Sequence, residues 1–347
     1  MELKTIKASW EELKAKEPNL RIRNAAERLG FSEVELLATK VGNGVTRLKS
    51  EFQSILKEVE KLGHVMALTR NESAVHERKG HYLNAELENP HVGLFVGEDI
   101  DLRIFFANWG SAFAVVEGTE EKPRKSIQFF AKDGEAIHKI YLTNKSNEAA
   151  YNEIVEKFKS ENQADFEEVR PIEKKKEFVA DEDVDLQAFH KEWVEMKDTH
   201  HFFGMLKKHK LDRLQALRLA PKGNYAIKVN NLSFRKAIEL AAEMSIPVMI
   251  FVGNGGMIQI HTGEVKKLVD HNDWFNILDP EFNLHLKESN IVESWIVRKP
   301  TEDGIVTAIE LFDENGEHIL QLFGKRKPGI PELTLWREIV EKVEKNQ

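Results

Sequence analysis

The sequence predicts an α+β protein built by tandem duplication, with two similar halves that each hold a large antiparallel β-sheet flanked by helices. Three observations lead to this prediction: the chain matches itself over a domain-sized length, both halves show the same order of helical and strand patterns, and tight-turn residues separate consecutive strands. Consecutive strands joined by tight turns pair antiparallel, which places the fold in the α+β class. A chain of 347 residues is long enough for two domains with proper cores.

The internal repeat is clearest where Asp101–Lys145 aligns without a gap on Asn283–Lys327, at an offset of 182 positions. Eleven of the 45 aligned positions are identical. A chance match between two β-rich stretches is the alternative explanation, but the match continues upstream with small changes of offset. The upstream pairs are Trp10 with Trp193, Gly42 with Gly223, Val65 with Val248, Asn71 with Asn254 and Gly80 with Gly263.

The elements are expected in the same order in each half. Apolar residues at helical spacing come first, as at 22–29 and 214–217, and alternating strands follow, as at 257–261, 295–297 and 309–312. Each half closes with a helix, at 147–160 and 331–345. A charged run separates the halves, so we expect an N-terminal repeat at 1–165, a solvated linker at 166–183 and a C-terminal repeat at 184–347.

Composition restricts the possible chemistry. The chain has no cysteine, which excludes disulfides, thiolate metal sites and cysteine-ligated haem or iron–sulfur clusters. Any metal chemistry must use the 13 histidines, the carboxylates, Tyr or Met. A net charge of −8 disfavours a protein whose main task is to neutralise nucleic-acid phosphates. The sequence shows neither a secretory leader nor an apolar run long enough for a membrane span, so we expect a cytoplasmic protein.

His200 and His201 are the clearest chemical difference between the halves, because alignment on Trp10 and Trp193 places Glu17-Pro18 opposite them. His200 has the spacing of one apolar helical face, whose members are Phe189, Trp193, Met196, His200 and Phe203. A neutral imidazole with hydrophobic surroundings suits a haem iron. From the pattern alone, a core histidine bonded to a carbonyl is the favoured interpretation. His201 is either an alternative ligand, a supporting group or simply exposed.

Basic residues supply the remaining candidates. Arg103 lies in an otherwise apolar strand and is matched by His285 in the second half. It either pairs with an acid or faces solvent, or it is a hydrogen-bond donor on the distal side of a haem. Near the C-terminus, Arg298-Lys299 and Lys325–Lys327 are either strand-end charges or a clamp for two haem propionates.

The motifs resemble the HemS/ChuS family of bacterial cytoplasmic haem-utilisation proteins, also called hemin-degrading factors. The resemblance rests on the segments Asp198–Phe203, Leu211–Leu217, Gly97–Arg103, Val297–Thr301 and Gln321–Arg326, which span most of the chain in order. It implies a fold of two similar halves that bind one haem b. Within that site it implies His200 as the proximal iron ligand, Arg103 on the distal side with Phe105 nearby, and Arg213, Lys299 and Arg326 next to the haem or its propionates. This chain departs from the family in having Leu320 and Phe323 where members often have tyrosines near the final strand.

The resemblance is compatible with two activities. In the first, an external reductase supplies electrons, Arg103 positions dioxygen, and the porphyrin is opened oxidatively with release of iron. In the second, the protein carries haem from an inner-membrane importer to a separate oxygenase, and the neighbouring His201 permits ligand exchange. The sequence does not distinguish a monomer from a homodimer.

A third and remote alternative is a haem-free regulator. Residues 24–30 and 33–40 faintly resemble a helix-turn-helix, but the net negative charge and the recurrence of a related helix pair in the second half favour packing. We therefore expect no nucleic-acid partner. The sequence contains no Walker A motif, no dinucleotide fingerprint after a strand, no Gly-x-Ser-x-Gly elbow and no His-Glu-x-x-His motif.

Overall fold

The computed structural model describes residues 3–172, 178–327 and 329–345. Part of the charged run expected to link the halves, 173–177, lies outside the described residues. The chain forms two compact units. Unit 1 comprises Met1–Arg70, Glu77–Glu173 and Gly253–Gln259, and unit 2 comprises Asn71–His76, Lys174–Val252 and Ile260–Gln347. The units thus differ from the two sequence halves by two short segments, one from each half.

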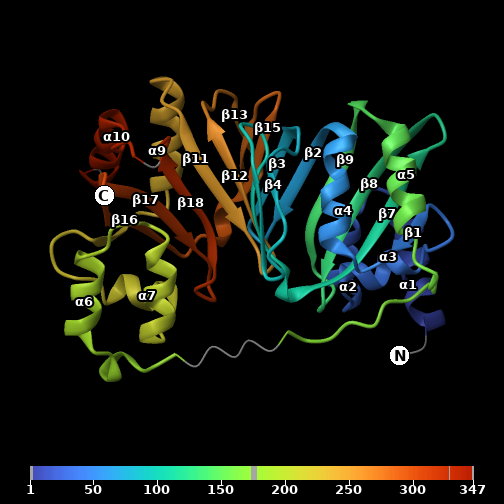
Figure 1. Ribbon diagram of the computed structural model, residues 1–347, viewed down its shortest axis with the longest axis horizontal. Helices are drawn as coiled ribbons and strands as arrows, with labels where there is room; N and C mark the ends of the chain where they lie inside the picture. Colours follow the sequence, from blue (N-terminus) through green and yellow to red (C-terminus); the bar gives the residue numbers. More distant parts are fainter. Residues whose placement is uncertain (1–2, 173–177, 328, 346–347) are drawn as a thin grey trace. The chain divides into compact units, whose positions relative to one another are not determined.

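Unit 1 contains a main sheet in the order β1-β7-β8-β9-β2 and a separate three-stranded meander, β4-β5-β6 (Figure 1). All the neighbouring strands in these two orders pair antiparallel. The strands are β1 (Val45–Leu48), β2 (Gly63–Arg70), β4 (Ala85–Glu86), β5 (Val92–Val96), β6 (Asp101–Phe105), β7 (Trp109–Thr119), β8 (Lys122–Ala131) and β9 (Ala136–Ser146). The helices are α1 (Leu3–Lys16), α2 (Ile22–Leu29), α3 (Glu33–Ala38), α4 (Phe52–Glu58) and α5 (Glu148–Phe158).

Unit 2 repeats this arrangement, with a main sheet in the order β10-β16-β17-β18-β11 and a meander of β13-β14-β15. The strands are β10 (Ala226–Val229), β11 (Val248–Gly253), β13 (Leu268–His271), β14 (Trp274–Leu278), β15 (Phe282–Lys287), β16 (Glu293–Thr301), β17 (Gly304–Phe312) and β18 (His318–Gly324). The helices are α6 (Leu186–Val194), α7 (His201–His209), α8 (Arg213–Arg218), α9 (Ser233–Glu243) and α10 (Thr334–Lys345). Two further strands, β3 (Ala74–Gly80) and β12 (Met257–Gly263), complete two nine-stranded sheets.

The predicted duplication is confirmed element by element. β8 begins at Lys122 and β17 at Gly304, while β9 begins at Ala136 and β18 at His318, so both pairs keep the offset of 182 found in the sequence. The short 3-10 turns that precede β7 and β16, at 106–108 and 288–290, keep the same offset. The α+β class with antiparallel sheets and flanking helices is likewise confirmed.

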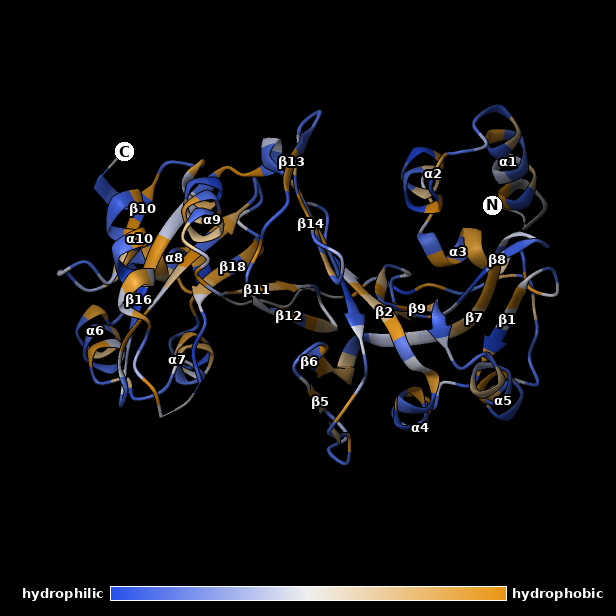
Figure 2. Ribbon diagram, turned by 90° about the horizontal axis from the view of Figure 1, so that it is seen from above, coloured by the Kyte–Doolittle hydropathy of each residue, from blue (hydrophilic) through white to orange (hydrophobic). Residues whose placement is uncertain are grey.

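Each unit has apolar cores because its sheet is packed by helices. In unit 2, α9 and α10 cover one large cluster that includes Phe234, Ile238 and Trp336, while α6–α8 contribute to a second cluster around Trp193 and Trp295. Figure 2 shows the same pattern in the hydropathy colours, with apolar residues along strands such as β7 and β16 and polar residues in the loops. None of the helices among the described residues is both long and apolar enough to cross a membrane.

Candidate functional site

His200 lies at the start of α7, where the chain changes direction, and not in the middle of a long helix. α6 ends at Val194 and α7 begins at His201, with a turn between them. Asp198 forms this turn because its Oδ1 accepts a hydrogen bond from the backbone N–H of His200 at 2.8 Å. An Asp that bonds the backbone two residues ahead competes with helix formation. The predicted helical face from Phe189 to Phe203 is therefore wrong, and Phe203 is 73% exposed.

Asp198 also orients the His200 imidazole. Its Oδ1 lies 2.6 Å from Nδ1 of His200, whose side chain is 83% exposed. The backbone bond from His200, followed by the contact with its ring, lowers the pKa of Asp198 and keeps it ionised. An ionised carboxylate makes Nδ1 the donor and leaves the Nε2 lone pair for a metal. Asp198 was named from sequence only as part of the Asp198–Phe203 motif and was assigned no role. An acid two positions before a histidine is a signal from which this contact could have been predicted.

The two units show which residues correspond to the histidines. Gly30 ends α2 and Lys210 ends α7, both in the left-handed region, and these caps differ by 180 positions. The capping boxes begun by Ser32 and Asp212 differ by the same 180 positions. In this register His200 is opposite Leu20, so the predicted match of His200-His201 with Glu17-Pro18 is corrected. The earlier match carried the offset of the tryptophans across loops of different length.

Three charged residues meet in the interior of unit 2, beside the first turn of α7. Glu310 on β17 is completely buried and accepts two hydrogen bonds from Arg213, from Nε and from Nη2, both at 2.7 Å. The Nζ of Lys299 on β16 donates to the same carboxylate at 3.1 Å. Two of the residues predicted from sequence, Arg213 and Lys299, are thus brought together by a third, Glu310, that was not predicted. We refer to Arg213, Lys299 and Glu310 as the Glu310 cluster.

The Glu310 cluster carries an excess positive charge. Burial by itself would raise the pKa of Glu310, but Arg213 and Lys299 outweigh it and hold the pKa well below its usual range. Burial lowers the pKa of Lys299 to about 8, and nearby Arg213 acts in the same direction against the attraction of Glu310. Burial also lowers the pKa of the neighbouring His318 to about 3, which keeps it neutral. Near neutral pH the cluster therefore holds two cations and one anion.

Phe202 connects this cluster to His200. Its buried ring lies 5.2 Å from the Arg213 guanidinium carbon and 4.2 Å from the Lys299 Nζ, and it packs edge-on against Trp193 at 4.9 Å. Because Phe202 is two residues after His200, the two cations support the α7 end that carries the imidazole. Of the two, Arg213 is the more accessible, with 23% of its side chain exposed against 4% for Lys299.

Neither Arg326 nor His201 forms a hydrogen bond or an ion pair with the Glu310 cluster among the described residues. Arg326 follows β18 and is half-buried, and its Nε has no hydrogen-bond partner among the described residues. His201 lines a groove of about 490 Å³ between α6 and α7, together with Met196, Met205 and His209. His200 is not among the residues of that groove, so the adjacent histidines serve different surroundings.

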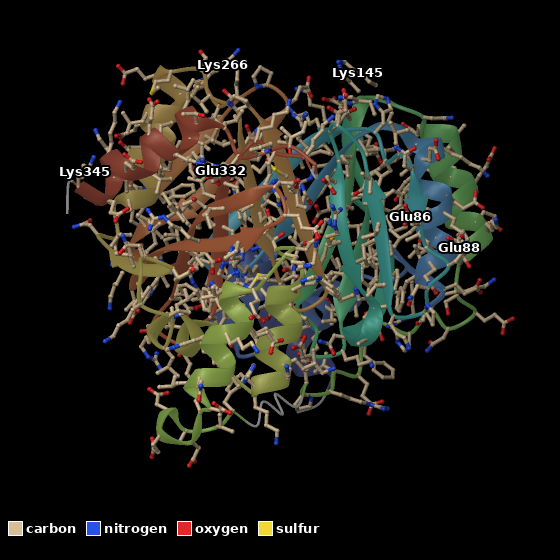
Figure 3. The ribbon with its side chains drawn as sticks, turned by 60° about the vertical axis from the view of Figure 1, so that its left-hand side comes forward. Glu86, Glu88, Lys145, Lys266, Glu332 and Lys345 are labelled. Carbon is tan, nitrogen blue, oxygen red and sulfur yellow. The ribbon has the colours of Figure 1, made fainter. Side chains whose placement is uncertain are left out.

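Arg103 and Phe105 belong to the meander of unit 1. The strand register puts Glu86, Leu94 and Arg103 in one row across β4, β5 and β6, and it places Val92 opposite Phe105. Figure 3 labels Glu86, the β4 member of this row. The alternate residues of these strands, such as Phe95, Leu102 and Ile104, face the core and are buried.

The outer face of this meander is apolar apart from a few polar groups. Val92, Val96 and Phe105 are each exposed by about two fifths of their surface. Arg103 forms an ion pair with Asp101, as expected for a strand arginine, and its Nη1 also donates to the Leu102 carbonyl. Burial raises the pKa of Asp101 although Arg103 opposes it. The result is an exposed apolar surface that carries one guanidinium.

The donor set agrees with haem better than with a free metal ion. No group of three or more His, Asp or Glu side chains that could hold a metal ion occurs among the residues the structure describes. A haem iron needs only one protein ligand, because the porphyrin supplies four others. Unit 2 thus offers one imidazole and one cluster of excess positive charge, and unit 1 by itself offers an apolar face with a guanidinium.

Comparison with known proteins identifies the family. The model of the haemin-degrading HemS.ChuX domain matches residues 30–158 and again residues 210–343. The chain belongs to this family. It is 40% identical over 338 residues to the hemin transport protein HemS of Yersinia enterocolitica, covering 96% of each chain. It is 41% identical to the hemin transport protein HmuS of Yersinia pestis, covering 94% of this chain and 93% of that protein.

Solved structures agree with this assignment. The chain is 45% identical to PhuS, a heme-binding protein from Pseudomonas aeruginosa, whose holo structure superposes with a TM-score of 0.95 and 99% coverage of both chains. It is 36% identical to ChuS, an Escherichia coli heme oxygenase, with a TM-score of 0.87 and coverage of 97% of this chain and 99% of that one. The predicted family is therefore confirmed, and the double match of the family model confirms the duplication.

Proposed function

We propose that this protein binds haem through His200 and opens the porphyrin oxidatively to release iron. The observation that carries the proposal is the exposed His200 imidazole, which Asp198 holds at Nδ1 while Nε2 remains for iron. The proposal is supported by two relatives that match nearly the full length of the chain, one a heme-binding protein and the other a heme oxygenase. Haem is the substrate in this proposal, and its own iron and porphyrin supply the redox chemistry.

The excess positive charge beside α7 would orient a bound haem by attracting its propionates. Haem propionates are carboxylates, and a carboxylate is favoured where two cations share one acid. Arg213 uses Nε and Nη2 for Glu310, which leaves Nη1 donors for a propionate. Arg326, with its unpartnered Nε, is the second proposed propionate contact, and Lys299 contributes mainly through its charge.

Arg103 and Phe105 are proposed to face the distal side of the haem. The apolar outer face of β5 and β6 suits a porphyrin because it excludes water over a broad area. The guanidinium of Arg103 would donate hydrogen bonds to dioxygen or to an ordered water, while Asp101 holds it in position.

His201 is the proposed alternative ligand of the haem iron. An external reductase, an inner-membrane importer and a cytoplasmic location remain predictions.

A carrier function is the second candidate, and the exposure of His200 is what favours it. A ligand that is 83% exposed is easily reached by a partner that receives haem. The carrier would deliver haem to a separate oxygenase without opening the ring. Both candidates require the same histidine, so they differ only in what happens after reduction.

Titration of the purified protein with ferric haem tests the binding step. We expect a one-to-one Soret complex that His200→Ala weakens, while the control His271→Ala, at an exposed histidine at the end of β13, leaves it intact. If both variants bind haem like the wild type, His200 is not the ligand. Reduction under air with catalase present then separates the two activities. Loss of the Soret band with iron release supports degradation, and a stable complex supports the carrier.

A further inference from the structure

Trp10 and Trp193 occupy corresponding positions in the repeat but differ in their hydrogen bonding. In unit 2, the Nε1 of the buried Trp193 donates to the carbonyl of Arg298 on β16 at 3.1 Å. In unit 1, Trp10 is 3% exposed, and its buried Nε1 has no acceptor among the described residues. A buried donor without an acceptor costs free energy unless a ligand or water satisfies it. Both copies therefore carry the indole, but among the described residues it has an acceptor only in unit 2.

The backbone around the two tryptophans is otherwise equivalent. Arg298 donates its backbone N–H to the Tyr225 carbonyl at 2.7 Å, and its counterpart Val116 donates to the Gly44 carbonyl at the same distance. The strand and the turn therefore meet in the same way in both units. The difference at Trp10 is local to its surroundings and does not come from a shift of the sheet.

A pocket of about 270 Å³ adjoins Trp10 between α1 and the segment that follows α3. Three lysines line it, Lys7, Lys14 and Lys40, with Glu11 as the one acid. The Nζ atoms of Lys14 and Lys40 lie 5.7 and 5.6 Å from the centre of a Trp10 ring. We call this the Trp10 pocket.

The lysines of the Trp10 pocket lack acidic partners. No ion pair joins Lys7, Lys14 or Lys40 to a carboxylate among the residues described, and Lys14 instead donates to the carbonyls of Pro18 and Leu20. Three lysines and one glutamate leave an excess of two positive charges, in a protein whose net charge is −8. Three ammonium groups with only one carboxylate among them repel each other, and a further anion between them reduces that repulsion.

We propose that the Trp10 pocket binds the phosphate group of a small molecule. A phosphate dianion matches the two excess charges, lysine is a common phosphate ligand, and Trp10 lines the pocket in which the ligand would lie. The pocket is smaller than most drug-sized sites, which suits free phosphate or the ester of a small metabolite. The site belongs to unit 1 alone, since the positions matching Lys7 and Glu11 in the second repeat are His190 and Val194.

Indole NMR signals test this proposal without reference to haem. Protein labelled with ¹⁵N is titrated with inorganic phosphate or with glycerol 3-phosphate, while sodium chloride keeps the ionic strength constant. The Trp10 signal is assigned by its loss in Trp10→Phe. We expect a saturable shift of this signal with at least one of the two ligands, and saturation by the ester alone would identify an ester site.

Matched lysine variants complete the test. Lys40→Met should weaken the binding about tenfold or more, since one charge-assisted hydrogen bond is lost. Lys222→Met removes an exposed lysine from the corresponding turn of unit 2 and should leave binding unchanged. The proposal is overturned if neither ligand produces a saturable shift, if chloride alone produces the same shift, or if Lys40→Met binds like the wild type.

Discussion

Replacing Glu310 by Gln removes the negative charge that holds Arg213 and the buried Lys299 beside α7, the helix that begins directly after the proposed haem ligand His200. Removal of one partner from a buried ion pair typically costs about 3–5 kcal/mol, because the other charge remains buried without compensation. Arg213 is 23% exposed and regains some solvation, whereas Lys299 is only 4% exposed. We therefore expect the lower end of that range, a loss of about 3 kcal/mol in the free energy of unfolding of unit 2.

The expected loss is also pH dependent. Glu310 supports the charged form of Lys299, whose pKa burial has already lowered to about 8. Without the carboxylate this pKa should fall further, so Lys299 loses its proton nearer to neutral pH. A neutral amine needs no counter-charge. The difference in stability between Glu310→Gln and the wild type should thus become smaller as the pH rises towards about 8, and it should level off above that pH, where folded Lys299 is neutral in both proteins.

Urea unfolding at several pH values, followed by tryptophan fluorescence and circular dichroism, measures this effect. The control is Glu117→Gln, which removes the acid of the Glu117–Arg124 pair between β7 and β8 of unit 1. That pair is largely exposed and should contribute less than about 1 kcal/mol. Glu310→Gln with wild-type stability at pH 7 would refute the reasoning, as would a loss no larger than that of the control.

Three further results are expected. Asp198→Asn should weaken haem binding about 10- to 100-fold in a Soret titration, because the carboxylate that orients His200 is lost; unchanged affinity would contradict this role. The wild-type protein should gain stability as the pH rises from about 8 to the usual lysine range, because the unfolded chain then binds a proton that folded Lys299 does not; a flat profile in urea unfolding would exclude it. Lys210→Gly should raise the unfolding free energy by about 1 kcal/mol, because Lys210 ends α7 with a φ of 53°, a left-handed conformation that costs less for glycine. A lower unfolding free energy would contradict this and show that the lysine side chain stabilises the fold by more than its backbone strain costs.

Much of the fold was predictable because it repeats. Hydrophobic alternation and turn residues are local signals, and a gap-free offset of 182 positions between two β-rich segments is improbable unless both fold alike. The same logic identified His200 and Arg103 as chemical differences between copies. These signals failed at the start of α7, where the apolar spacing continues through a turn that Asp198 creates.

The Glu310 cluster shows what local patterns cannot reveal. Arg213 and Glu310 are 97 positions apart in the chain, and neither has a neighbour in sequence that indicates the pairing. The register of β16 with β17 and the docking of α8 bring them together in the interior. Trp10 gives a second case, because sequence alignment equates it with Trp193 although only one of the two indoles has an acceptor.

Sequence alone therefore establishes the duplicated α+β class and the family, because both depend on residue order and on periodicities that are local to each element. The packing of distant segments alone decides which groups share a buried charge, which nitrogen of a histidine stays accessible and which lysines gather without an ion-pair partner. Burial increases the free-energy effect of each such partner. An unpaired charge or donor in the interior cannot form a hydrogen bond with water in place of the missing protein partner.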